Sequence, residues 1–91
     1  MYKIIFTDSY DRKAKRFLKQ HPDLRKQYQK CLELLESNPF HPSLNLHKLK
    51  GRLAGLFAVS INLAYRINIE FLIEDKVILP VNVGSHDEVY D

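Results

Sequence analysis

The last residues of the chain, VGSHDEVY, place a histidine between an apolar run and an acidic ending. This residue, His86, has an imidazole that can give or take a proton near neutral pH, which suits general acid–base chemistry. A second histidine, His47, lies in the segment LHKLKGR, whose cations are Lys48, Lys50 and Arg52. Residues 41–66 carry no acid, and such a zone can attract phosphate groups. The pattern favours proton transfer beside a bound phosphate as a candidate chemistry.

Each candidate residue also has a structural interpretation. His86 could cap the last turn, and Tyr90 could close the core under the end of the sheet. Arg66 could pair with Glu70 across an outer sheet face. We expect the other two histidines, His21 and His41, to be surface or capping residues. The cations of the first helix suit either a solvated face or a contact with nucleic acid, and they are Arg12, Lys13, Lys15, Arg16 and Lys19.

The composition excludes several classes of protein. The only cysteine, Cys31, cannot form an internal disulfide, and we expect it to be a buried packing residue. The four histidines are too scattered for a paired-ligand motif, so we expect neither a metal nor another cofactor. No apolar run approaches the roughly twenty residues of a membrane helix. The sequence therefore predicts a cytoplasmic protein without membrane contact, with one domain over residues 1–91.

The charge is unevenly distributed along the chain. The formal net charge is +3 and the pI is about 9.1. Residues 1–30 hold nine Lys or Arg against three acids, and residues 67–91 hold six acids against Lys76. Two basic zones and an acidic ending follow from this distribution.

Hydrophobic residues repeat at helical spacing in two segments. The first stripe follows Asp8 or Ser9, either of which could cap the helix, and comprises Tyr10, Ala14, Phe17 and Leu18. The second stripe lies between Pro22 and the Ser37-Asn38-Pro39 stop, and comprises Leu24, Tyr28, Cys31, Leu32 and Leu35. The linking turn is short, so the pattern predicts a helical hairpin that is apolar inside and basic outside.

The remaining segments favour strands. Residues 2–7 form a short β-rich run, residues 40–52 show no sustained period and are expected to be a loop, and alternation begins at Leu53. Ile67 and Ile69 fall on one face of the 65–74 strand, whereas Arg66 and Asn68 fall on the other. Residues 74–76 suit a compact turn. In the last strand Pro80 lacks an N–H, which predicts an edge position or a bulge.

These elements define an α+β, two-layer domain. An N-terminal strand and a helical hairpin pack on a mainly antiparallel sheet that a C-terminal three-strand meander completes. The hairpin covers one face of the sheet. The opposite face, which receives Arg66 and Asn68, is where chemistry is expected.

Three short motifs in this order of elements carry a resemblance to a known family. HKLKG before the meander, AYRI inside it and VGSHDEVY at its end are similar to the RelE/ParE superfamily of type II toxin–antitoxin toxins, nearest to its YafQ-like and RelE-like mRNA endonucleases. The resemblance covers the whole chain. It implies ribosome-dependent RNA cleavage without a metal, in which the 2′-hydroxyl attacks the adjacent phosphate, and an antitoxin partner that covers the basic surface.

The resemblance also implies roles for individual residues. His86 matches a terminal catalytic histidine, and His47 matches a second histidine that would carry the other proton. Tyr90 would stack on a base or order the nucleophile, and Arg66 would bind phosphate in the transition state. The basic segment that would bind RNA comprises Lys48, Lys50 and Arg52.

Two departures from the family pattern keep alternatives open. Many relatives carry an arginine where this chain reads AVSIN, with Ser60 or Ile61 in its place. The acids around His86 would either keep the imidazole protonated or oppose RNA binding, and they are Asp87, Glu88 and Asp91. A ParE-like inhibitor of DNA gyrase is therefore a second hypothesis, and a degenerate relative that only binds an antitoxin is a third.

Overall fold

The computed structural model describes residues 1–90, apart from the side chains of Glu88 and Tyr90. Its α-helices are α1 (Asp8–Gln20), α2 (Arg25–Ser37) and α3 (His86–Tyr90). Three short 3-10 helices are η1 (Pro22–Leu24), η2 (Pro42–Leu44) and η3 (Gly51–Leu53). The strands are β1 (Lys3–Ile4), β2 (His47–Lys48), β3 (Phe57–Ser60), β4 (Tyr65–Leu72) and β5 (Val77–Ser85).

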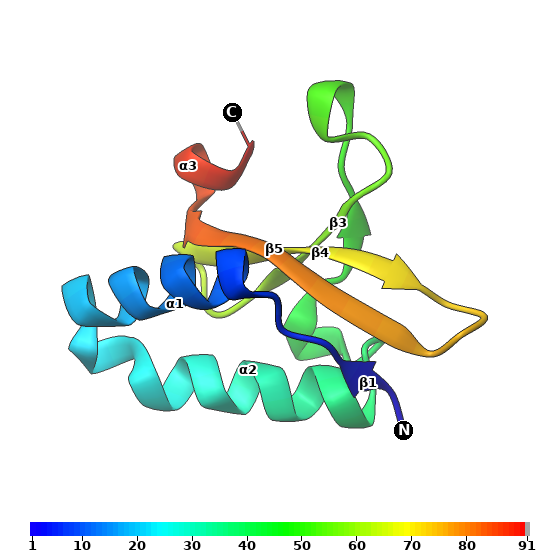
Figure 1. The fold of residues 1–91 in the computed structure, drawn as a ribbon, viewed down its shortest axis with the longest axis horizontal. Coiled ribbons are helices and arrows are strands. Elements are labelled where there is room, and N and C mark those ends of the chain that lie inside the picture. Colours follow the sequence, from blue (N-terminus) through cyan, green and yellow to red (C-terminus); the bar gives the residue numbers. More distant parts are fainter. Residues whose placement is uncertain (91) are drawn as a thin grey trace.

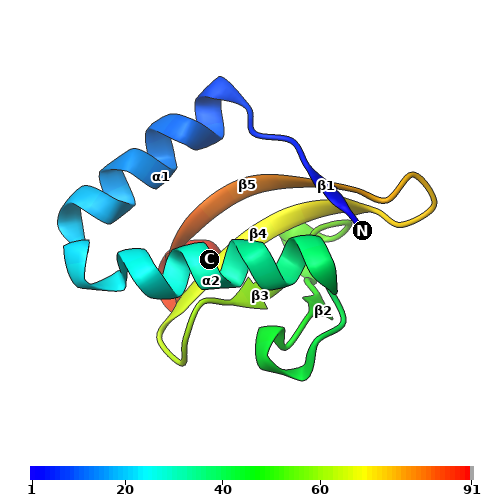
Figure 2. The ribbon, with the colours of Figure 1, turned by 90° about the horizontal axis from the view of Figure 1, so that it is seen from below.

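The two long helices form the predicted hairpin. Figures 1 and 2 show α1 and α2 on one side of the sheet, with α1 running beside β5. Burial of Tyr10 and Phe17 on α1 and of Tyr28 and Leu35 on α2 confirms both predicted stripes. The expected cap of α1 was wrong, because the hydroxyl of Thr7, and not Asp8 or Ser9, accepts the Tyr10 N–H. Both helix ends agree with the predicted stops.

The five strands form a mixed sheet in the order β1-β5-β4-β3-β2. The meander of β3, β4 and β5 is antiparallel, and β1 adds a short parallel pair to β5. The side chains of alternating residues on β3 and β4, among them Val59 and Ile67, are fully buried against the helical hairpin. The α+β two-layer prediction is therefore confirmed, together with the predicted alternation of the strands.

Pro80 lies at a bulge rather than at an edge. In the β4–β5 ladder Asn68 pairs with Asn82 and Ile69 pairs with Pro80, so Val81 is an extra residue on β5. A bulge accommodates the missing N–H of a proline inside a sheet. This extra residue bends β5 beside the centre of the sheet.

Two segments differ from their sequence-based description. Residues 40–52 were expected to be a loop, but they contain η2, the edge strand β2 and part of η3. The last residues form α3, which packs on β4 and β5. Figure 1 shows α3 and the loop that carries η3 standing on the side of the sheet opposite α1 and α2. Within residues 1–90 no helix is both long and apolar enough to cross a membrane.

Candidate functional site

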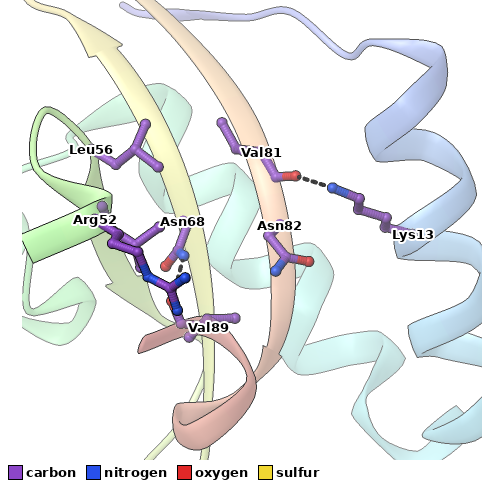
Figure 3. A pocket seen from close by; sticks show the side chains of 8 residues that line it. Lys13, Arg52, Leu56, Asn68, Val81, Asn82 and Val89 are labelled. Carbon is purple, nitrogen blue, oxygen red and sulfur yellow. Dashed lines mark hydrogen bonds between the residues drawn. The ribbon is translucent and has the colours of Figure 1, made fainter. Parts of the chain in front are cut away.

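A cleft lies on the outer face of the sheet, between the η3 loop and α3. Its volume is about 380 Å³, within the usual range for small-ligand sites. Asn68 on β4 and Asn82 on β5 line it together with Arg52, which precedes β3, and Val89 of α3. Figure 3 shows these side chains converging from four separate segments. The cleft therefore combines amides, apolar groups and a guanidinium on the face where chemistry was expected.

A second cation reaches this cleft from α1. The Nζ atom of Lys13 donates a hydrogen bond to the Val81 carbonyl at 3.2 Å, and Val81 is the bulged residue of β5 (Figure 3). The bulge presents that carbonyl to a helix 68 residues away in sequence. Lys13 and Arg52 thus border one cleft, and their charges favour an anionic ligand there.

The two asparagines of the cleft differ in exposure. Asn82 is half-buried, and its Oδ1 accepts the backbone N–H of Val83 at 2.9 Å. Asn68 is only 2% exposed, and its Nδ2 donates to the Val89 carbonyl at 2.8 Å. The amide of Asn68 therefore joins β4 to α3 across the cleft wall.

His86 begins α3 directly after β5. Its backbone N–H donates to the Ala64 carbonyl at 3.1 Å, which ties the start of α3 to the β3–β4 turn. The imidazole is 59% exposed, and its Nδ1 lies 3.8 Å from the Asp87 carboxylate. The ring is thus accessible to a ligand and lies beside one of the acids noted in the sequence. The side chains of Glu88 and Tyr90 and all of Asp91 lie outside the described residues.

Arg66 lies at the same end of the sheet as His86 but turns toward the backbone. It pairs with Gly84, two residues before His86. Its Nη1 donates to the carbonyls of Asn62 at 2.6 Å and Tyr65 at 3.2 Å. These bonds stabilise the β3–β4 turn, so part of the guanidinium has a structural role in this conformation. The partners of that structural role are backbone carbonyls of the turn and not the Glu70 carboxylate considered from the sequence.

His47 lies on the edge strand β2, three strands away from β5, the strand that leads into His86. It pairs with Ala58, whose row across the sheet continues through Asn68 to Asn82. Three strand spacings separate β2 from β5, about 14 Å, and His86 is offset by four further residues along β5. The Nδ1 of His47 lies 2.7 Å from the Asn45 carbonyl. The structure therefore does not bring the two histidines to one point.

The remaining candidate cations extend from the same loop. Lys48 ends β2 and Lys50 precedes η3, and both side chains are exposed. Arg52 lines the cleft, whereas Lys48 falls in the strand row of Phe57 and Ile69, which pack in the core on the other face of the sheet. The cationic zone of the sequence thus reaches the cleft through Arg52. Asn68 was expected on this face of the sheet, whereas Lys13 and Asn82 were not predicted as cleft residues.

The other histidines and the cysteine have structural contacts. The Nδ1 of His41 accepts the Ser43 N–H at 3.1 Å and so caps η2. The ring of His21 lies between those of Phe17 and Tyr65, with centroids 4.9 and 4.8 Å away. Cys31 is buried, as expected, and burial raises the pKa of its thiol to about 12. Among the side chains that the structure describes, which leave out that of Glu88, no three His, Cys, Asp or Glu groups are placed so as to hold a metal ion.

The fold matches solved structures of small toxins. No family model and no curated protein matches the sequence. YafQ from E. coli superposes with a TM-score of 0.79 at 16% identity over 100% of both chains. A metal-bound toxin from Helicobacter pylori gives 0.76 at 24% identity, covering 99% of this chain and 100% of that one.

A third match is a toxin–antitoxin pair. The YoeB–YefM complex from Staphylococcus aureus gives a TM-score of 0.69 at 21% identity, over 94% of this chain and 98% of the matched chain. The architecture is thus the one that these toxin structures share. More narrowly, the chain has the fold of YafQ from end to end.

Proposed function

We propose that the chain is the toxin of a toxin–antitoxin system and cleaves mRNA on the ribosome. The observation that carries this proposal is the outer-face cleft, bordered by Arg52 and Lys13 and lying beside the helix that begins at the exposed His86. The end-to-end match to the fold of YafQ supports it by analogy, whereas the activity itself must come from the residues of the cleft. Residues 1–91 would act as one cytoplasmic domain.

The proposed reaction is a metal-free transesterification. The 2′-hydroxyl of one nucleotide gives its proton to a water molecule as its oxygen attacks the adjacent phosphorus. The bond to the 5′-oxygen breaks, and a 2′,3′-cyclic phosphate and a 5′-hydroxyl result. The imidazolium of His86 gives its proton to the leaving 5′-oxygen. Arg52 and Lys13 stabilise the charge that develops on the phosphorane oxygens. Tyr90 is proposed to stack on a base or to order the attacking hydroxyl.

The position of His47 limits its role in this reaction. Because it lies three strands from β5, it could accept the hydroxyl proton only if the segment around β2 and η3 moved toward α3. We therefore assign His47, with Lys48 and Lys50, to RNA binding. Arg66 is proposed to reach phosphate only if it releases the carbonyls of the β3–β4 turn.

The proposed partner is a cognate antitoxin. Solved structures of the same fold include the DinJ–YafQ and YoeB–YefM complexes. An antitoxin segment that covers the cleft would exclude RNA and neutralise Arg52 and Lys13. Ribosome and mRNA are the proposed targets in its absence.

A gyrase inhibitor of the ParE type is the second candidate function. The chain has Ser60 and Ile61 where many RNA-cleaving relatives carry an arginine, and this substitution favours an inhibitor without nuclease activity. One structural match is itself described as a YoeB/ParE toxin, from Agrobacterium tumefaciens.

Induced expression of the wild type and of His86→Ala distinguishes the two functions. Rapid arrest of translation with cut mRNA, abolished by His86→Ala, is expected for the nuclease. DNA damage without mRNA cuts would support gyrase inhibition, and harmless expression of the wild type would contradict both.

A further inference from the structure

Asn68 is the one amide or charged residue that is buried among the side chains that the structure describes. It lies in the middle of β4, between Ala58 on β3 and Asn82 on β5. Asparagine is disfavoured inside strands, and its neighbours Ile67 and Ile69 are apolar and fully buried. Its Nδ2 donates to the Val89 carbonyl at 2.8 Å, whereas its Oδ1 is buried without a hydrogen-bond partner (Figure 3).

The unpaired oxygen makes Asn68 an expensive residue for stability. A buried acceptor without a partner loses its bonds to water and gains nothing in return. An apolar side chain of similar size would avoid this cost. The bond to Val89 is therefore the feature that distinguishes asparagine from an apolar residue at this position.

The helix that receives this bond cannot maintain its own position. α3 has five residues, and an isolated helix of that length does not form in water. Its start is tied by the His86 N–H to the Ala64 carbonyl, and Val89 is buried with 2% exposure. The Asn68 bond supplies a partner for a last-turn carbonyl that has none within the helix.

The Asn68 bond also fixes the rotation of α3. Each residue of an α-helix turns by about 100°, so a slip of one residue would swing the His86 ring away from its present direction. The His86 N–H bond and the Asn68 bond hold α3 at two points three residues apart, and the buried side chain of Val89 packs between them and the sheet. The Asn68 bond thus adds a fixed point at the last turn of α3.

We propose that Asn68 is a positioning residue, which holds α3 in one orientation and thereby fixes the His86 imidazole for proton transfer. The proposal deepens the proposed function and rests on it for the role of His86. The attachment of α3 to β4 by Asn68 is a separate physical claim that can be measured without RNA.

The test compares Asn68→Val with the matched variant Asn82→Val. The two residues are cross-strand partners in the same cleft, but only Asn68 bonds to α3. Backbone amide hydrogen exchange at His86 measures docking of α3. Thermal unfolding measures global stability, and cleavage of mRNA on purified ribosomes gives kcat and KM.

Asn68→Val removes the unpaired oxygen but also leaves the Val89 carbonyl without its partner, so the two effects oppose each other and we expect the thermal midpoint to stay near that of the wild type. We expect exchange at His86 to become about 10-fold faster or more, and kcat to fall about 10- to 100-fold with KM within about threefold, as for a misplaced catalytic group. Asn82→Val should leave His86 exchange at the wild-type rate.

Wild-type exchange at His86 in Asn68→Val would overturn the proposal, and so would a loss of kcat matched by a general loss of stability. If the wild type cuts no mRNA, the proposed function fails, and the exchange measurement still decides the attachment of α3.

Discussion

Replacing Arg52 by glutamine should make RNA binding less sensitive to salt. Arg52 and Lys13 are the cations that border the cleft, so each is expected to contact one phosphate. Each such contact on single-stranded nucleic acid contributes about 0.7 to the slope of log affinity against log salt concentration. Arg52→Gln should thus lower the slope by about 0.7, and the double variant with Lys13→Gln by about 1.4.

Fluorescence anisotropy of a labelled 12-nucleotide RNA, titrated at several salt concentrations, measures this slope. A fourfold rise in salt should weaken binding about 2.6-fold less in Arg52→Gln than in the wild type. Lys26→Gln is the matched control, because Lys26 is exposed on α2, on the other side of the sheet. An unchanged slope for Arg52→Gln, with a reduced slope for Lys26→Gln, would refute the assignment of the cleft.

Three further predictions concern buried groups. Tyr28→Phe leaves the Tyr10 hydroxyl without its partner at 2.7 Å, and should lower the free energy of unfolding by about 1–3 kcal/mol, as measured by urea denaturation. If the two hydroxyls are coupled, the double variant Tyr10→Phe/Tyr28→Phe must lose less stability than the sum of the losses of the two single variants. With the pKa of its thiol at about 12, only a fraction of about 10⁻⁴ of Cys31 should be thiolate at pH 8. A disulfide reagent should therefore react quickly only with the unfolded protein, and rapid labelling of the native protein would contradict the burial of Cys31. Burial also raises the pKa of both tyrosines, so the folded protein keeps these protons to higher pH than the unfolded chain. Stability should be complete below about pH 9 and decline as the pH rises from there toward 12; equal urea midpoints at pH 8 and pH 11 would count against this.

Local periodicity was sufficient to predict most of the fold. The helical spacing of Tyr10 and Phe17 and the alternation of Ile67 and Ile69 are imposed by burial of one face, and burial leaves its signature in sequence. β2 and α3 carry no such signature, because two and five residues are too short for a period to appear. Packing against the sheet, which the sequence does not display, stabilises both.

The candidate site was predictable only in part. Alternation placed Asn68 on the outer face, and the cationic zone of the sequence included Arg52. Lys13 joins the cleft through a bond across 68 residues to a bulge, which requires the tertiary structure. The expected meeting of His47 and His86 failed for a similar reason, since strand order and register decide which residues become neighbours.

The most direct test of the account is cleavage of a defined mRNA on purified ribosomes. The wild type, His86→Ala and His41→Ala would be compared; His41 is a matched control because it only caps η2. We predict cuts that leave 2′,3′-cyclic phosphate ends, a rate about 10²- to 10⁴-fold lower for His86→Ala, and an unaltered rate for His41→Ala. Cleavage by His86→Ala at the wild-type rate would contradict the assignment of His86, and an intact mRNA with the wild type would contradict the nuclease itself.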